Sequence, residues 1–234
     1  MKIVAIIPTL NEVNNIEKLF NKLNKLKIEI VILFIDDNST DGTKEVIIKL
    51  NRKYKNIKYI FRPKRLGIGS AHKCGFKWAK KNHFKFCVTL DADMTHDPLL
   101  IKKMSSLLIK KELEIISTSR FKLKNSLKSW PIIRVFITKV RYYLVCFLLN
   151  TNYDSSGGFR LYDLRKIKFK HLLKSKNNSY FFLIESLFFL EKLNYKIFEI
   201  PIILPYRLHG SSKMKLTDIF SSFLNLIKLR ISNS

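Results

Sequence analysis

Apolar residues in the first half of the chain form short continuous runs that alternate with helical patterns. Ile3–Ile7 and Ile30–Ile35 are runs of the type found in strands buried on both faces, and Lys58–Phe61 and Phe86–Leu90 are two further candidate strands. The helical pattern between the first two runs has its apolar positions at Ile16, Leu19, Phe20 and Leu23. Strands that alternate with helices indicate βαβ units. We therefore predict an α/β fold with a mainly parallel central sheet flanked by helices.

The length of the chain indicates its domain organisation, and its cysteines indicate its redox compartment. With 234 residues and 47% hydrophobic residues, the chain can bury a large core and does not have the composition of a disordered protein. No internal repeat or low-complexity linker interrupts it, so we predict one domain over residues 1–210, followed by a loop and an amphipathic helix over 211–234. The three cysteines, Cys74, Cys87 and Cys146, are odd in number and far apart. They favour a reducing compartment and argue against a disulfide framework.

The charge of the chain is extreme. Its 44 Lys and Arg residues outnumber 18 Asp and Glu residues, which gives a formal net charge of +26. Such a charge favours a polyanionic partner: a nucleic acid, an anionic membrane surface or a phosphorylated substrate. Compositional drift is an alternative, because the chain is rich in Lys, Asn, Ile and Phe together. The basic residues are spread along the chain without an RNA-binding or zinc-finger signature, so we expect no nucleic-acid partner.

Two apolar segments bear on membrane contact. Ile132–Leu149 is interrupted by three cations, namely Arg134, Lys139 and Arg141. It is too charged for a membrane span, and no signal peptide precedes the first strand. The composition of Trp130–Leu149, which includes this window, is that of a helix lying in a lipid interface, and Leu216–Ile231 repeats that character. Ordinary core helices are the alternative for both segments.

Two stretches carry candidate chemistry. Val88–Leu90 leads directly into Asp91 and Asp93, at the carboxyl end of a predicted strand, where α/β proteins bind ligands. Two carboxylates there suit a hard divalent cation that also contacts phosphates, although an acidic turn is the alternative. Between the third and fourth strands, Gly67-Ile68-Gly69 follows several basic residues. This stretch is either a tight turn or the start of a helix whose amides face a phosphate.

Eight motifs in sequence order carry a family resemblance. They are Ile7–Glu12, Asp36–Thr43, Gly67–Ala71, Asp91–Pro98, Ser119-Arg120, Trp130 with Arg134, Ser156–Arg160, and Arg207–Lys213. This set resembles glycosyltransferase family 2, whose members have the GT-A fold, and within it the polyprenyl-phosphate branch that includes the dolichol-phosphate mannose synthases. The resemblance runs from about residue 3 to residue 215.

The resemblance implies how a nucleotide sugar is bound. The residues that match the family's nucleotide positions are Pro8, Leu10, Glu12, Ile35, Asp37 and Ala92. Leu10 replaces a tyrosine that is frequent there, which implies looser packing against the base. Arg207 and Lys213 match positions that clamp the donor diphosphate after a loop closes.

The resemblance also implies the metal site. Mg²⁺ or Mn²⁺ is expected on Asp93, with Asp91 and with Thr95, which stands where relatives often have Gln or Ser. His96 is either a further metal ligand or only a loop residue.

On the acceptor side, a polyprenyl monophosphate is already anionic and needs no general base. Arg120 and Arg134 match the family's acceptor-phosphate arginines.

The implied reaction is transfer of mannose from GDP-mannose to dolichyl phosphate, with UDP-glucose as the alternative donor. A basic membrane- or nucleic-acid-binding protein without activity is the alternative from another class. The implied location is the cytosolic face of a membrane (the endoplasmic reticulum in a eukaryote), reached peripherally or through small anchoring subunits. Glu185 remains unassigned.

Overall fold

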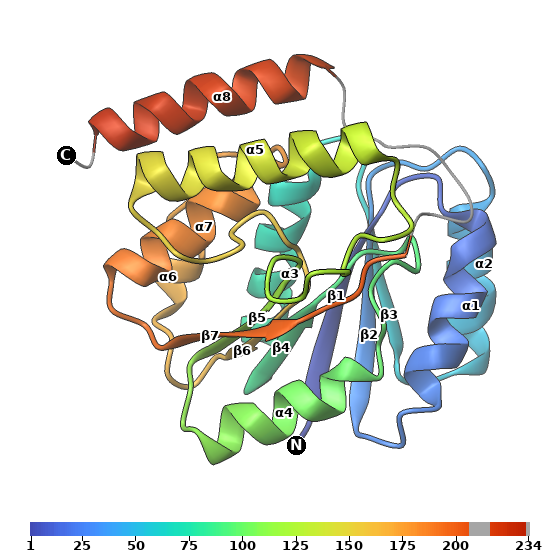
Figure 1. The fold of residues 1–234 in the computed structure, drawn as a ribbon. Helices are drawn as coiled ribbons and strands as arrows, with labels where there is room; N and C mark the ends of the chain where they lie inside the picture. Colours follow the sequence, from blue (N-terminus) through green and yellow to red (C-terminus); the bar gives the residue numbers. More distant parts are fainter. Residues whose placement is uncertain (206–215, 233–234) are drawn as a thin grey trace.

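A seven-stranded mixed sheet forms the centre of the protein (Figure 1). The computed structural model describes residues 1–205 and 216–232. The strands are β1 (Ile3–Thr9), β2 (Ile30–Asp36), β3 (Ile57–Phe61), β4 (Phe86–Thr89), β5 (Ile115–Ser119), β6 (Arg160–Asp163) and β7 (Ile197–Pro201). Their order is β3-β2-β1-β4-β6-β5-β7, and β6 alone in this sheet runs antiparallel to its neighbours. The predicted α/β class and the four predicted strands are confirmed.

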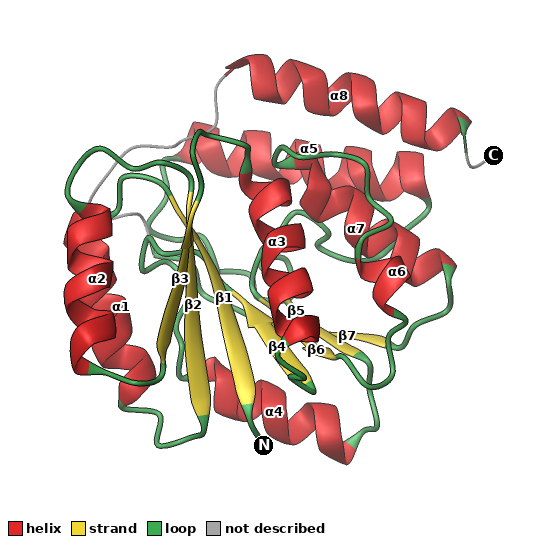
Figure 2. Ribbon diagram, turned by 180° about the vertical axis from the view of Figure 1, so that it is seen from behind, coloured by secondary structure: helices red, strands yellow, loops and turns green. Residues whose placement is uncertain are grey.

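Helices cover both faces of the sheet (Figures 1 and 2). One face is covered by α1 (Val13–Asn24), α2 (Thr43–Lys53) and α4 (Leu100–Lys110). The other is covered by α3 (Ile68–Lys81), α6 (Phe169–Leu172) and α7 (Phe181–Lys192). Outside α7 lie α5 (Ile132–Leu149) and α8 (Leu216–Ile231), side by side.

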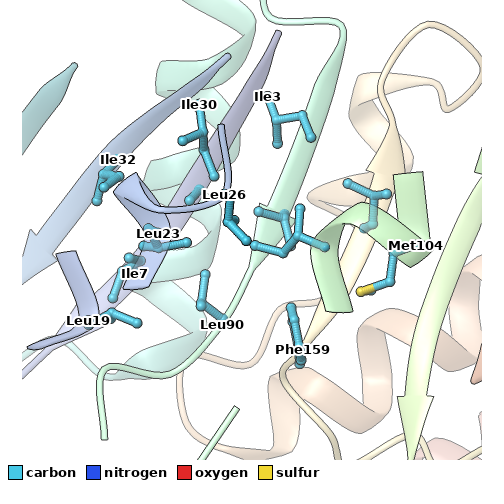
Figure 3. Packing of buried hydrophobic residues seen from close by; sticks show 14 of the residues in the cluster. Ile3, Ile7, Leu19, Leu23, Leu26, Ile30, Ile32, Leu90, Met104 and Phe159 are labelled. Atoms are coloured by element: carbon cyan, nitrogen blue, oxygen red, sulfur yellow. The ribbon is translucent and has the colours of Figure 1, made fainter. Parts of the chain in front are cut away.

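The alternation of side chains in β1 explains why its sequence is a continuous apolar run. Successive residues of a strand point to opposite faces. Ile3 and Ile7 therefore belong to the cluster that α1 and α4 cover, and Figure 3 shows Ile7 near Leu19 and Leu23, whereas Val4 and Ile6 pack on the α3 side. Both sets are fully buried, and each large apolar side chain buried in this way contributes roughly 1.5 to 3 kcal/mol.

The C-terminal helix is part of this packing. Leu226 and Leu229 of α8 are buried against Val145 and Leu149 of α5 and against α7. The predicted division at residue 210 falls outside the described residues and stays a prediction.

One edge of the sheet collects the loops that carry the candidate site. Strands β1 to β5 and β7 all end at this edge, and β6 begins there, because it runs in the opposite direction. The acidic residues that follow β2 and β4 and the arginine that follows β5 are thereby brought together. This is the edge at which ligands bind in open α/β sheets.

Candidate active site

Two cavities lie at this edge of the sheet. The first, of about 360 Å³, lies over the ends of β1, β2 and β4, and we call it the β1–β2 cavity. The second, of about 680 Å³, lies under α5, and we call it the α5 cavity. Both are lined by Ile68, Asp91, Asp93 and Tyr180. The two carboxylates after β4 therefore stand where the cavities meet.

The β1–β2 cavity collects the residues that the resemblance assigns to the nucleotide. Its lining includes Pro8, Leu10, Glu12, Ile35, Asp37 and Ala92. The sequence-based prediction thus names residues that share one cavity, although their roles stay predictions. Arg207 and Lys213 lie outside the described residues.

Asp37 is already engaged by the protein. Its buried carboxylate forms an ion pair with Arg62 and accepts the amide of Gly67 at 2.9 Å. Arg62 also donates to Ser70 Oγ at 2.9 Å and to the Gly67 carbonyl at 3.1 Å. Asp37 and Arg62 together therefore fix the loop before α3 while lining the cavity. The sequence did not single out Arg62, although its place directly after β3 puts it at the same edge.

The glycine-rich stretch begins helix α3, with Gly67 as its N-cap. Gly67 has φ 91°, and a side chain there would clash with the carbonyl of Asn178. That carbonyl accepts the amide of Gly69 at 2.9 Å and that of Ser70 at 3.4 Å. The stretch is therefore not only a tight turn, because it starts a helix. It also differs from the predicted phosphate-facing helix start, because the amides of Gly67, Gly69 and Ser70 donate to protein acceptors.

A tight turn after β4 fixes the position of Asp93. Met94 adopts φ 65°, which lets Asp93 Oδ1 accept the Thr95 amide at 3.1 Å and the Thr95 hydroxyl at 2.6 Å. Asp93 is buried, whereas the Asp91 side chain is 32% exposed. The Thr95 hydroxyl thus orients Asp93, and its predicted role as a metal ligand stays a prediction.

His96 supports the same turn. Its Nδ1 accepts the amide of Asp91 at 3.0 Å, so the proton of the neutral ring is on Nε2. Nε2 lies 3.9 Å from Asp91 Oδ2, and the ring stacks on Phe159. Because a protonated nitrogen does not ligate a metal, this tautomer favours a loop-supporting role for His96.

The donor set of Asp91 and Asp93 fits a hard divalent cation. Mg²⁺ is commonly held by one or two carboxylates that share it with substrate phosphates and water. Within the described residues, no group of three or more His, Cys, Asp or Glu side chains is placed to hold a metal ion. Two carboxylates on one cavity border therefore match a cation whose remaining positions are filled by ligand oxygens.

Arg120, at the end of β5, is held by a buried carboxylate. Its Nε and Nη2 donate to the two oxygens of Asp154 at 2.8 and 2.6 Å, and its amide donates to Asp154 at 3.0 Å. Burial would lower the pKa of Arg120, but the charge of Asp154, its hydrogen bond and the charge of Asp91 together outweigh burial and raise that pKa. Burial likewise would raise the pKa of Asp154, and Arg120 holds it below its ordinary value. Asp154 and the Ser156 hydroxyl, which also accepts from Arg120, were not predicted as site residues.

Helix α5 presents a polar stripe to its cavity. Arg134, Thr138 and Arg141, spaced four and three residues apart, all line the α5 cavity. Arg134 lies 4.2 Å from the ring centroid of Trp130, whose Nε1 donates to the Leu204 carbonyl at 3.1 Å. Sequence reasoning missed Arg141 as a site residue, although its spacing of seven from Arg134 was a signal.

A second face of α5 is apolar and exposed. Ile132 and Phe147 are 89% and 83% exposed, Lys139 is exposed between them, and none of the three lines the α5 cavity. Further exposed apolar residues of α5 are Tyr143 and, at the border of the cavity that they also line, Ile133, Phe136, Ile137 and Val140. None of the helices in the described part of the chain combines the length and the apolar character that a membrane crossing requires.

Glu185 of α7 has a local role. It accepts hydrogen bonds from the Ser175 hydroxyl and, at 3.2 Å, from the amide of Asn177. It therefore stabilises the segment whose Asn178 carbonyl caps α3.

Comparisons with known sequences agree with this arrangement. The sequence model described as glycosyl transferase family 2 matches residues 4–182. A dolichol-phosphate mannosyltransferase of Pyrococcus furiosus is 34% identical over 245 residues; the match covers 98% of this chain but only 64% of that protein. An undecaprenyl-phosphate mannosyltransferase of Micrococcus luteus is 26% identical over 92% of this chain and 88% of its own length.

Solved structures share the fold. A glucosyl-3-phosphoglycerate synthase of Mycobacterium tuberculosis, in complex with Mn²⁺, UDP and glucosyl-3-phosphoglycerate, has a TM-score of 0.69 at 18% identity, over 99% of this chain and 79% of that one. A mannosyltransferase from Pyrobaculum calidifontis, in complex with GDP-Man and Mn²⁺, has a TM-score of 0.61 at 12% identity, over 99% and 63%. These likenesses confirm the predicted GT-A fold. The match of the family model over residues 4–182 establishes that the chain belongs to glycosyltransferase family 2.

Proposed function

We propose that this protein transfers a sugar from a nucleotide sugar to the phosphate of a long polyprenol, with GDP-mannose and dolichyl phosphate as the first choice. The observation that carries the proposal is the meeting of two unlike cavities at Asp91 and Asp93. One is lined by the predicted nucleotide residues, and the other is apolar with arginines on its wall. The mannosyltransferases of Pyrococcus furiosus and Micrococcus luteus, named for dolichol and undecaprenyl phosphates, support the same choice of acceptor.

On the donor side, the residues of the β1–β2 cavity bind and orient the nucleotide. Asp91 and Asp93 would hold Mg²⁺ or Mn²⁺ at the cavity border, and Mn²⁺ is present in both solved relatives described above. When bound, such a cation neutralises the negative charge that develops on the leaving diphosphate. Thr95 keeps Asp93 in the required orientation. Arg207 and Lys213 remain our candidates for clamping the diphosphate.

On the acceptor side, the arginines recruit a nucleophile that needs no deprotonation. Arg120 and Arg134 line the α5 cavity, where a guanidinium can contact phosphate oxygens through two hydrogen bonds. A phosphate oxygen then forms a bond to the anomeric carbon while the bond from that carbon to the diphosphate breaks. The product is an inverted sugar on the lipid phosphate, and the nucleoside diphosphate departs.

The lipid acceptor requires access to a membrane. The exposed apolar face of α5 borders the cavity through Ile133, Phe136 and Val140, and Phe223 of α8 is also exposed. A charge of +26 complements an anionic lipid surface. We propose that this face lies peripherally in the headgroup region of a membrane, on the cytosolic side that the three free cysteines favour.

Membrane attachment predicts a specific loss in a double variant. Ile132→Asp with Phe147→Asp places charges on the most exposed part of α5, outside the α5 cavity. Burying each side chain in the interface is worth roughly 1.5 to 3 kcal/mol, so we expect binding to vesicles with anionic lipids to fall at least about tenfold. Ile109→Asp is the matched control, because Ile109 is 52% exposed on α4, away from this face. Sedimentation with vesicles measures the effect; wild-type binding by the double variant would remove α5 from the membrane contact.

A transfer assay tests the function and the choice of donor. The protein is incubated with dolichyl phosphate, Mn²⁺ or Mg²⁺, and either labelled GDP-mannose or labelled UDP-glucose, and the lipid is extracted. We expect labelled lipid with GDP-mannose. Labelled lipid from UDP-glucose alone would show that UDP-glucose, the alternative donor, is the one used. Labelled lipid from neither donor would refute the proposed function.

A further inference from the structure

The charges around the α5 cavity are not equally balanced. Arg120 donates three hydrogen bonds to the fully buried Asp154, two of them from its guanidinium. A bidentate pair of this kind matches one charge with one opposite charge. Arg120 therefore contributes little net positive charge to the cavity, although it lines it.

Arg141 is in the opposite situation. Its guanidinium donates to the uncharged Ser156 hydroxyl at 3.4 Å. Within the part of the chain that the structure describes, no carboxylate lies at ion-pair distance from Arg141. Burial, followed by the neighbouring charge of Arg120, lowers its pKa to about 10; the charge of Asp154 offsets this only in part, and Arg134 adds to the lowering. A cation that is destabilised by burial and by like charges is stabilised when an anion binds beside it.

The position of Arg141 connects it to the reacting end of the cavity. Arg120 and Arg141 both donate to the hydroxyl of Ser156. Two residues further on, Gly158 packs against Asp91, so closely that a β-carbon at Gly158 would lie 3.3 Å from Asp91 Oδ1. The loop from Ser156 to Gly158 therefore links Arg141 to the carboxylates at which the two cavities meet.

From this arrangement we infer that Arg141 binds the phosphate group of the acceptor, together with Arg134, and that Arg120 mainly holds Asp154 and Ser156 in place beside it. The inference rests on the proposed function, because it assumes a phosphate monoester in the α5 cavity. It assigns the net charge of the phosphate site to a residue that no sequence motif pointed to.

The inference is tested by direct binding, without catalysis. Calorimetric titration compares a ten-carbon prenyl monophosphate with the prenyl alcohol of the same chain, on wild-type protein and on variants. We expect wild type to bind the phosphate at least about tenfold more tightly than the alcohol, and Arg141→Gln to lose most of that preference. Lys139→Gln is the matched control, since it removes one charge from the exposed face of the same helix. It should bind the phosphate as wild type does.

Each outcome separates the inference from the proposed function. If wild type does not prefer the phosphate, the proposed function fails. If it does and Arg141→Gln retains the preference, only the role of Arg141 is overturned. Arg141→Lys keeps the charge but loses the bidentate guanidinium donor. We therefore expect its affinity for the phosphate to lie between those of wild type and Arg141→Gln. Should Arg141→Gln not fold, wild-type affinity in Arg141→Lys overturns the inference and weaker affinity supports it.

Discussion

Asp93→Asn is expected to reduce sugar transfer by a factor on the order of 10³ while leaving the fold intact. The asparagine oxygen can still accept the amide and hydroxyl of Thr95, so the turn after β4 is preserved. What is lost is the negative charge at the meeting point of the two cavities. Without it, Asp91 is the one carboxylate left at this point to attract a divalent cation, so the cation and the donor diphosphate that it would contact are bound more weakly. We therefore expect Mn²⁺ affinity in the presence of GDP to fall as well.

The control for this variant is Asp97→Asn. Asp97 is an exposed carboxylate in the same loop, where its Oδ1 accepts the amide of Leu99 at 3.1 Å. Asparagine keeps that hydrogen bond and removes one charge, so transfer and Mn²⁺ binding should stay close to wild type. Initial rates of transfer and electron paramagnetic resonance of Mn²⁺ measure the two effects. Wild-type Mn²⁺ binding by Asp93→Asn would contradict the metal assignment.

Asp154→Asn is expected to destabilise the fold by about 3 kcal/mol or more. Removing one partner of a buried ion pair leaves the other charge buried and unmatched. Here the amide group of asparagine would also turn a donor toward the donors of Arg120.

Because the folded-state pKa of Asp154 is below 3.8, the pair stabilises wild type above about pH 4, and this contribution is lost as the pH falls through the folded-state pKa.

Denaturant unfolding at pH 7 measures this effect. Glu17→Gln is the control, since it breaks an exposed ion pair of 3.4 Å with Lys49 and should cost under about 1 kcal/mol. In a double-mutant cycle, Arg120→Met should partly rescue Asp154→Asn, because it removes the unmatched cation. Additive effects of the two substitutions would show that Arg120 and Asp154 do not act as a pair.

The sequence was most informative where a strand is buried on both faces. The run Ile3–Ile7 predicts β1 because a short run that is apolar at every position is typical of a strand covered on both faces, and all five residues are buried. By contrast, β5 ends in Ser117-Thr118-Ser119, and β6 has only four residues, of which the first is a buried arginine and the last a buried aspartate. Neither has a continuous apolar run, and the antiparallel direction of β6 follows from long-range pairing with β4 and β5.

The candidate site shows the same limit. Asp91 and Asp93 were predictable, because they directly follow a strand and all parallel strands end at one edge. Asp154 was not, since its partner Arg120 is 34 residues away and the pair exists only in the folded chain. From the sequence, Lys139 and Arg141 are interpreted only as cations of a helix in a lipid interface, whereas Arg134 also matches an acceptor-phosphate position. In the structure they divide, with Arg134 and Arg141 on the cavity and Lys139 on the exposed face.

The most direct test of the account is a transfer reaction with paired acceptors. Labelled GDP-mannose and Mn²⁺ are supplied with either a polyprenyl phosphate or the polyprenol of the same length, at equal concentration. We expect labelled lipid with the phosphate and none with the alcohol, because the arginines of the α5 cavity recruit an acceptor that is already charged. Equal labelling of the two acceptors, or labelling of the alcohol alone, would contradict it.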